Sequence, residues 1–144
     1  MNLTIREFNQ NDFTFLKEII SEYLEKEISD ADLQNRMDFI KNCTTENLYV
    51  CEIDSVGRGI IATRIRENIE ENSRFLEVSL IVTRLSERRN GLGKQMISFA
   101  EQKAKELKCT GLWLVSGFGR EEAAHKFYKD LGFVITGYRF RKIF

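Results

Sequence analysis

The stretch Arg88-Arg89-Asn90-Gly91-Leu92-Gly93-Lys94 separates two segments whose apolar residues follow different periods. Before it, residues 75–82 are rich in branched and aromatic side chains, which favours a strand. After it, apolar residues recur every three or four positions from Met96 to Leu107, which predicts an amphipathic helix. A glycine turn between a strand and a helix leaves backbone N–H groups unpaired at the positive end of the helix dipole. The stretch therefore predicts a phosphate-binding turn, and its glycines would let such a ligand approach the backbone closely.

Two common phosphate-binding sequences do not fit this turn. A P-loop ending at Gly93-Lys94 needs glycine at position 88 and Ser or Thr at 95, where the chain has arginine and glutamine. The dinucleotide fingerprint needs a third glycine where Met96 stands. What remains is R-x-x-G-x-G, from Arg88 to Gly93. This hexapeptide resembles the pyrophosphate-binding signature of the GNAT superfamily of acetyl-CoA-dependent N-acetyltransferases. A turn without a ligand is the alternative that the hexapeptide alone leaves open.

A second motif lies near the C-terminus, in the segment Ala123-Ala124-His125-Lys126-Phe127-Tyr128-Lys129-Asp130-Leu131-Gly132-Phe133. It resembles the closing A-x-x-x-Y-x-x-x-G-F segment of the same family, in which a short helix ends at a glycine and leads into a strand. Gly132 suits the left-handed position after a helix. The two motifs occur in the family's order, and the resemblance covers most of the chain, from about Leu3 to the end.

The expected order of elements also matches the family. Strands are expected at 3–8, 48–53, 59–65, 75–82 and 111–115, with closing strands over 134–144. Residues 54–57 are expected to form the turn of a hairpin, and residues 66–74 a loop of charged and polar residues. Helices are expected after the N-cap region Asn11-Asp12, around 33–40, from the glycine turn to about Leu107, and around Tyr128. The fold class is then α/β, with a GNAT-type mixed central β-sheet flanked by α-helices on both faces. Residues 1–144 are expected to form a single N-acetyltransferase domain.

Composition limits the classes of function. The chain has 144 residues, 42% of them hydrophobic, which suffices for one core. Its 22 basic and 22 acidic residues give a formal net charge of zero, so we expect no nucleic-acid or membrane-surface partner. Three cysteines at no metal-ligand spacing indicate reduced thiols in a cytoplasmic protein without a metal site. Cys109 follows a helix end, which argues against a covalent acetyl-enzyme there.

The resemblance implies that acetyl-CoA is the co-substrate and assigns it two stretches of backbone. The turn would hold the pyrophosphate, through Arg88, Arg89, Asn90, Gly91, Leu92, Gly93 and Lys94. The preceding strand would pair with the pantetheine arm, through Leu80, Ile81, Val82 and Thr83. Ordinary pairing with a neighbouring strand is the alternative for the second stretch. For Arg84 and Arg89 the alternative is that they are solvated neighbours of the site.

The resemblance also implies two catalytic residues. Tyr128 matches the family tyrosine beside the coenzyme sulfur, which acts as a general acid or hydrogen-bond donor. Its alternative is a packing role next to Phe127. Glu77 interrupts a mostly apolar strand eleven residues before Arg88, a spacing that matches the catalytic glutamate of some members, and we expect it to take a proton directly or through water. An exposed glutamate on the polar face of a strand is the alternative, and many members rely on water relays instead.

The acceptor is the least determined part. Ser116, Gly117 and Gly119 follow the strand where acceptors usually reach the thioester, and Glu121 stands where relatives often have asparagine. His125 is interpreted as a helix-surface residue. An acidic surplus over residues 12–38 favours a cationic amine. The expected function is transfer of an acetyl group from acetyl-CoA to a primary amine by direct attack; the alternative is a non-catalytic acyl-CoA-binding module. A homodimer that pairs strands over 134–144 is expected as well.

Overall fold

The computed structural model describes residues 1–116 and 121–144. The chain divides into two compact units, Met1–Trp113 and Leu114–Phe144. The first unit holds a five-stranded sheet in the order β1-β2-β3-β4-β5. Its strands are β1 (Leu3–Glu7), β2 (Glu46–Ile53), β3 (Val56–Glu67), β4 (Arg74–Thr83) and β5 (Gly111–Trp113). The first four strands are antiparallel to their neighbours, whereas β5 runs parallel to β4. The sheet is therefore mixed, which confirms the predicted fold class.

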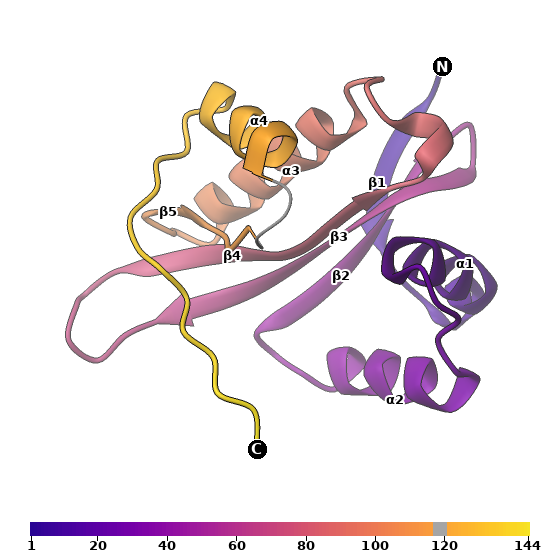
Figure 1. Ribbon diagram of the computed structural model, residues 1–144, viewed down its shortest axis with the longest axis horizontal. Coiled ribbons are helices and arrows are strands. Elements are labelled where there is room, and N and C mark those ends of the chain that lie inside the picture. Colours follow the sequence, from indigo (N-terminus) through magenta and orange to yellow (C-terminus); the bar gives the residue numbers. More distant parts are fainter. Residues whose placement is uncertain (117–120) are drawn as a thin grey trace. The chain divides into compact units, whose positions relative to one another are not determined.

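Helices cover both faces of this sheet. Helices α1 (Phe13–Leu24) and α2 (Asp30–Lys41) lie on one side of the strands, and α3 (Leu92–Glu106) lies on the other (Figure 1). On the first side, α1 and α2 form a buried core with the strands, made of Leu16, Ile19, Leu33, Met37, Leu48, Ile60 and Val82. On the second side, the ring of Phe99 on α3 packs edge-on against Tyr49 of β2, with centroids 4.8 Å apart. Alternation along each strand sends successive side chains to these two cores.

The helical segment that leads into α1 is capped by Asn9, before the N-cap region Asn11-Asp12 that the sequence predicted. Asn9 caps a short helical turn, Gln10–Asp12, and its side chain accepts a hydrogen bond from the N–H of Asn11 at 2.8 Å. Asp12 in turn accepts from the N–H of Asn9 at 2.8 Å and from Arg6 at 2.9 and 2.8 Å. The predicted boundary of the helix is correct, but Asp12 bonds backward to the first strand instead of capping α1.

Strands β3 and β4 run further than predicted, so the expected loop over 66–74 shrinks to residues 68–73. As a result, Arg66 lies on a strand, opposite Phe75. A bulge interrupts the same ladder, because Ala62 faces Leu80 whereas Thr63 faces Val78. A bulge leaves one residue of β4 unpaired and increases the local twist.

The ladder between β4 and β5 is short. It joins Phe75–Glu77 to Gly111–Trp113 and involves three residues on each strand, although β4 continues to Thr83. Beyond Glu77, no described residue pairs as a strand with this edge of β4. The two parallel strands therefore stop pairing at Glu77 and Trp113.

The second unit contains the predicted short helix, α4 (Lys126–Asp130), preceded by a wider helical turn at Glu121–His125. Gly132 has a φ of +92°, and its N–H donates to the carbonyl of Lys129 at 3.0 Å. The N–H of Phe133 donates to Tyr128 O, also at 3.0 Å. These two bonds form a Schellman motif, so the predicted left-handed glycine is confirmed.

The closing strands predicted over 134–144 are wrong. None of these described residues is in a strand, and Val134, Phe140 and Phe144 are 78%, 93% and 108% exposed. Apolar alternation favours a strand, but a strand also needs the edge of a neighbour to bond with.

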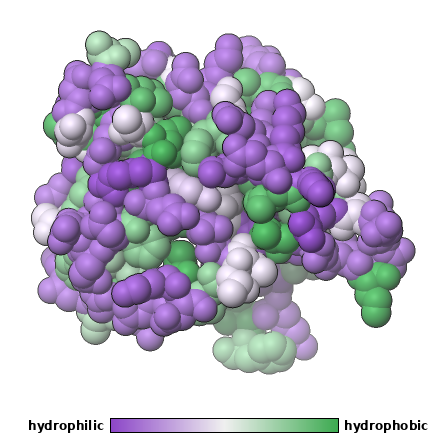
Figure 2. All heavy atoms as spheres, turned by 180° about the vertical axis from the view of Figure 1, so that it is seen from behind, coloured by the Kyte–Doolittle hydropathy of each residue, from purple (hydrophilic) through white to green (hydrophobic). Residues whose placement is uncertain are grey.

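The face turned away from the view of Figure 1 is largely hydrophilic, with apolar groups scattered between (Figure 2).

Within the described part of the chain, no helix is both long enough and apolar enough to span a lipid bilayer.

Candidate functional site

The predicted phosphate turn is built by two left-handed residues and the start of α3. Arg89 has a φ of 67° and Gly91 a φ of 79°. Gly91 precedes the first residue of α3 and contributes no side-chain cap. Gln95 is the first residue whose N–H bonds back, to the carbonyl of Gly91 at 3.1 Å. The N–H groups of the first helical turn are therefore without an intrahelical partner, which is the arrangement that binds anions.

Three cations belong to the same short segment as these N–H groups. Arg88, Arg89 and Lys94 are exposed, and none of them forms an ion pair with another described residue. Arg84 differs, because its guanidinium pairs with Glu18 at 2.7 Å and lies over the ring of Phe15 at 5.2 Å. Of the basic residues near the turn, Arg84 thus attaches it to α1, and the other three remain available to a ligand.

Two more contacts hold the segment just before the turn against α1 and β3. The N–H of Leu85 donates to Glu22 of α1 at 2.7 Å, and Arg58 of β3 pairs with Glu87 at 3.2 Å. An anion-binding turn gains from such attachments, because donors that are already in place lose little entropy when the ligand binds.

The predicted pantetheine strand is the half of β4 that lies beyond the bulge. Its register partners on β3 are ordinary: Leu80 faces Ala62, Ile81 faces Ile61, Val82 faces Ile60 and Thr83 faces Gly59. The opposite edge of this stretch faces no described strand, because β5 ends its pairing at Glu77. Backbone donors and acceptors along residues 80–83 are thus left for another partner.

Glu77 is buried, with 6% of its surface exposed, so its interpretation as an exposed strand residue is wrong. Its carboxylate accepts a hydrogen bond from Arg64 at 3.2 Å and lies 3.4 Å from Nε of Arg66. Arg64 also pairs with Glu46 at 2.5 Å, and Arg66 stacks over the ring of Trp113 at 4.3 Å. Two guanidinium groups therefore pair with this one carboxylate.

Sequence reasoning missed Arg64, Arg66 and Trp113. Nothing in their local sequence marks them, because they meet Glu77 only through the strand register. Two arginines two residues apart on one strand would share a face, and this spacing could have indicated the pair. Because Arg66 was predicted to lie in a loop, the spacing carried no such meaning.

Tyr128 belongs to the second unit and is partly buried there. Its ring packs edge-on against Phe127 and Phe133, with centroids 5.2 and 5.7 Å away. These contacts fix the plane of the phenol. They are compatible with the packing role and with a role as proton donor.

Of the remaining residues that the sequence placed near the acceptor, some lie outside the described part of the chain, whereas His125 lies within it. Gly117 and Gly119 lie outside the described residues. His125 is partly buried at the edge of a shallow hollow on α4, beside Lys126, whose ammonium pairs with Asp130 at 2.6 Å.

The acidic surplus over residues 12–38 is partly neutralised by ion pairs with the rest of the protein. Asp12 pairs with Arg6, and Lys17 pairs with Glu27 and Asp30 at 3.2 and 2.7 Å. Glu18 and Glu22 bind the turn region as described above. The count of charges therefore does not describe the field that an acceptor would meet.

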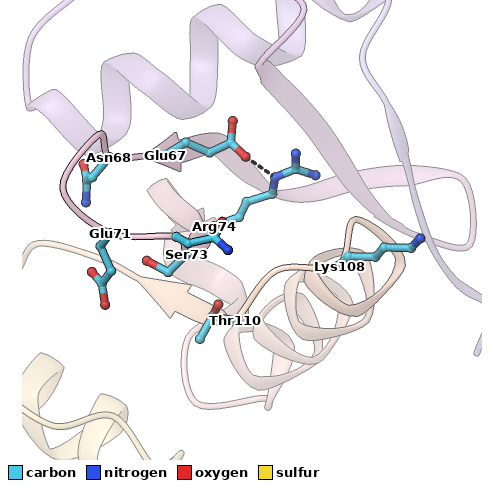
Figure 3. Close-up of a pocket in the computed structure, with 8 residues that line it drawn as sticks. Glu67, Asn68, Glu71, Ser73, Arg74, Lys108 and Thr110 are labelled. Carbon is cyan, nitrogen blue, oxygen red and sulfur yellow. Dashed lines mark hydrogen bonds and ion pairs between the residues drawn. The ribbon is translucent and has the colours of Figure 1, made fainter.

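A pocket of about 460 Å³ lies away from the turn, at the β3–β4 hairpin and the end of α3 (Figure 3). Its walls are polar, and Arg74 pairs with Glu67 at 2.7 Å across it. Nearby, burial raises the pKa of Cys109, which keeps this thiol protonated and unsuited to nucleophilic attack. Among residues 1–116 and 121–144, no three His, Cys, Asp or Glu side chains gather as a metal site would require.

Comparisons with known proteins agree with this geometry. The chain is 33% identical over 86 residues to an uncharacterized N-acetyltransferase in the pepI 3' region of Lactobacillus delbrueckii subsp. lactis. The match covers 58% of this chain and 49% of that protein, so it spans about half of the relative's length.

Solved structures share the fold. A transcriptional regulator from Bacillus halodurans C-125 superposes with a TM-score of 0.89 at 20% identity, covering 99% of this chain and 100% of the other. A GNAT family acetyltransferase from Staphylococcus aureus subsp. aureus USA300_TCH1516 gives 0.82 at 23% identity, with full coverage of both (100% and 100%). The aminoglycoside N-acetyltransferase AAC(6')-Iy, in complex with CoA, gives 0.81 at 18% identity over 99% of this chain and 93% of its own.

The model of the acetyltransferase (GNAT) family matches residues 13–133, which include the phosphate turn, β4 and the helix that carries Tyr128. The chain belongs to the GNAT acetyltransferase family.

Proposed function

We propose that the protein is an acetyl-CoA-dependent N-acetyltransferase that acts on a primary amine. The observation that carries the proposal is the turn at the start of α3, which combines N–H groups without an intrahelical partner and three exposed cations that form no ion pair with a described residue. This is the arrangement that a pyrophosphate needs. The CoA complex of a protein with the same fold, the aminoglycoside N-acetyltransferase, supports the choice of ligand.

The free edge of β4 supports the same assignment. Residues Leu80–Thr83 have backbone groups without a strand partner on the side of β5, at a short distance along the chain from the turn. An extended amide-containing arm would satisfy these groups as a strand does. The unpaired backbone N–H groups near the bulge are suited to stabilise the oxyanion that forms when a thioester is attacked.

In the proposed reaction the amine nitrogen attacks the thioester carbonyl directly. A C–N bond forms, the C–S bond breaks, and the amine loses one proton while the thiolate gains one. Glu77 is the proposed acceptor of the amine proton, directly or through water, and Tyr128 is the proposed donor to the thiolate. Neither metal nor covalent enzyme intermediate takes part in this scheme.

A second candidate function is a non-catalytic module that binds or senses acyl-CoA. It is favoured by the structural roles that both proposed catalytic groups already have. Glu77 is held by two arginines, and the ring of Tyr128 packs between Phe127 and Phe133. Such a module would bind acyl-CoA through the turn but would not catalyse acetyl transfer.

Calorimetric titration with acetyl-CoA, with CoA and ATP as controls, tests the ligand, and Tyr128→Phe tests the chemistry. We expect saturable one-to-one binding of acetyl-CoA. In an acetylation assay over a panel of amines, Tyr128→Phe should lower kcat by about tenfold to a hundredfold and leave the affinity for acetyl-CoA unchanged. Absence of acetyl-CoA binding would refute the proposal. Binding without turnover on any amine would establish the sensing module instead.

The remaining partner assignments are proposals as well. We propose a cytoplasmic protein whose partners are acetyl-CoA and an amine, and that contacts neither nucleic acid nor membrane. We also propose a homodimer formed through the exposed apolar residues of 134–144, such as Phe140 and Phe144. Light scattering on the full chain and on Phe140→Ser should show a dimer and its loss, respectively; a monomeric full chain would contradict the proposal.

A further inference from the structure

One row of register partners crosses four strands of the sheet and carries charge along its length. Glu46 on β2 faces Arg64 on β3, Arg64 faces Glu77 on β4, and Glu77 faces Trp113 on β5. Register partners project to the same face of a sheet. Arg66 lies two residues from Arg64 on the same strand, so it shares this face. We call these five residues the charged row.

The two kinds of charge in the charged row are buried to different extents. The side chains of Glu77 and Glu46 are 8% and 17% exposed, whereas those of Arg64 and Arg66 are 43% and 42% exposed. The carboxylates thus lie against the sheet and the guanidinium groups lie toward solvent. The outermost charge of the charged row is positive, although its formal charges cancel.

Both arginines keep donors that the carboxylates do not use. Arg64 donates through Nε to Glu46 and through Nη1 to Glu77, and its contacts end there among the described residues. Arg66 approaches Glu77 through Nε only. Its guanidinium carbon lies over the ring of Trp113, 4.3 Å from the centroid, and contact through the guanidinium face leaves the N–H groups at its edge for other partners. Arginine edges of this kind bind carboxylate and phosphate in a forked geometry.

The position of the charged row connects it to the proposed reaction. Glu77 and Trp113 are the last paired residues before β4 and β5 stop pairing, and the bulge of β4 follows directly at residues 78–80. An amine that approaches Glu77 there would have Arg64 and Arg66 within a few ångströms, since both lie 3.2 to 3.4 Å from the same carboxylate.

We propose that Arg64 and Arg66 bind an anionic group of the acceptor, so that the preferred acceptor is a compact zwitterion with a carboxylate or phosphate a few bonds from its amine. The inference rests on the proposed function and names its substrate class. It narrows the expectation of a cationic amine, which rested on an acidic surplus that ion pairs with Arg6 and Arg84 reduce.

Matched acceptor pairs test the inference. β-Alanine is compared with propylamine, and O-phosphoethanolamine with ethanolamine, by kcat/KM for acetylation with saturating acetyl-CoA. In at least one pair, the member with the carboxylate or phosphate should exceed the member without it by about tenfold to a hundredfold, which is the effect of one charge-assisted fork. The pair with the larger ratio identifies carboxylate or phosphate as the group bound. Ratios near one in both pairs, or no acetylation of any member, would overturn the inference.

Variants then locate the effect. Arg66→Gln should reduce the ratio by about tenfold, mainly through KM, and Arg66→Lys should retain part of it, because a lysine keeps the charge but loses the fork. Arg74→Gln is the matched control, since Arg74 also lies on this sheet and pairs with an exposed glutamate, Glu67, away from the charged row. A ratio that persists in Arg66→Gln and in Arg64→Gln would overturn the inference.

Acetyl-CoA binding, measured by calorimetry on the same variants, separates the two proposals. Retained binding together with equal ratios refutes the substrate class and leaves the proposed function standing. If the unmodified protein does not bind acetyl-CoA, both the proposed function and the proposed substrate class are refuted.

Discussion

The phosphate turn and the charged row lie in the same unit and are built in opposite ways. The turn is one continuous segment, Arg88 to Lys94, whose backbone presents the donors. The charged row takes its members from four strands that span positions 46 to 113. In the turn, side chains matter mostly by being small or absent. In the charged row, the side chains supply the charges, and the backbone contributes only the register that aligns them.

The difference concerns what each arrangement tolerates. A turn that binds through backbone N–H groups keeps its function when exposed side chains change, but it depends on the left-handed residue Gly91. A row that binds through paired charges is sensitive to the loss of an arginine, because the buried carboxylate of Glu77 then loses one of its two partners. The predictions below use this contrast, from the largest expected effect to the smallest.

Glu77→Gln should have the largest effect, because it removes the proposed proton acceptor from the charged row. We expect kcat to fall by about a hundredfold or more, while the Kd for acetyl-CoA stays constant. Glu46→Gln is the matched control, since it also removes a carboxylate bound to Arg64 but lies one strand further from β4. A kcat that is equally low in both variants would show that Glu77 acts only by maintaining the charged row.

Substitution of Gly91 tests the turn. No atom lies within 4 Å of a Cβ built there, so the protein itself has room for a side chain. Gly91→Val adds bulk and backbone strain, whereas Gly91→Asn adds bulk with less strain, because asparagine tolerates a positive φ. Both should weaken acetyl-CoA binding by about tenfold or more, with kcat at saturation less affected. If Gly91→Asn binds as tightly as the unmodified protein, the ligand does not approach this backbone.

Neutralising Arg88 and Arg89 together should have a smaller effect. Both side chains are exposed and without an ion pair among the described residues, so each adds mainly screened attraction. We expect Arg88→Gln/Arg89→Gln to raise the Kd for acetyl-CoA by about three- to tenfold at low salt. Raising the ionic strength should shrink the difference, as calorimetry at two salt concentrations would detect. A salt-independent loss would indicate a specific contact instead.

Asp12→Asn should affect stability and leave catalysis unchanged. Hydrogen bonds from Arg6 hold the pKa of Asp12 below its ordinary value, against the opposing effect of burial. A lowered pKa contributes stability above the ordinary pKa of about 4, and this stability is lost as the pH falls through the folded value. The variant should lose about 1–3 kcal/mol at pH 7, and the loss should narrow below about pH 4. Urea titrations at both pH values measure it; an unchanged gap at low pH would contradict the assignment.

Much of the fold could be predicted from the sequence, and so could the backbone geometry of the turn before α3. The turn was found because its signals are local: a strand period, two glycines and a helix period follow one another within the chain. Gly132 was placed correctly for the same reason, since a helix end has a local backbone geometry. Glu77 was singled out as a charge in an apolar strand, but its burial and its partners could not be seen in the sequence.

The failures share a physical cause. The strands expected over 134–144 have the apolar residues of a strand, yet a ladder requires an edge, which no local pattern supplies. The charge count over residues 12–38 could not include ion pairs such as Arg84–Glu18, because these join residues far apart in the chain. Arg66 was placed in a loop because charged residues at a strand end are indistinguishable from a polar turn.

By itself, the sequence determined most of the order of the elements, the glycine turn before α3 and the family motifs, because each depends on backbone preferences within a few neighbouring residues. Only the tertiary structure decided that Glu77 is buried, that Arg64 and Arg66 hold it, and that Trp113 closes the charged row. Strand register brings these residues together, and register is set by how two faces of a whole sheet pack against α1, α2 and α3.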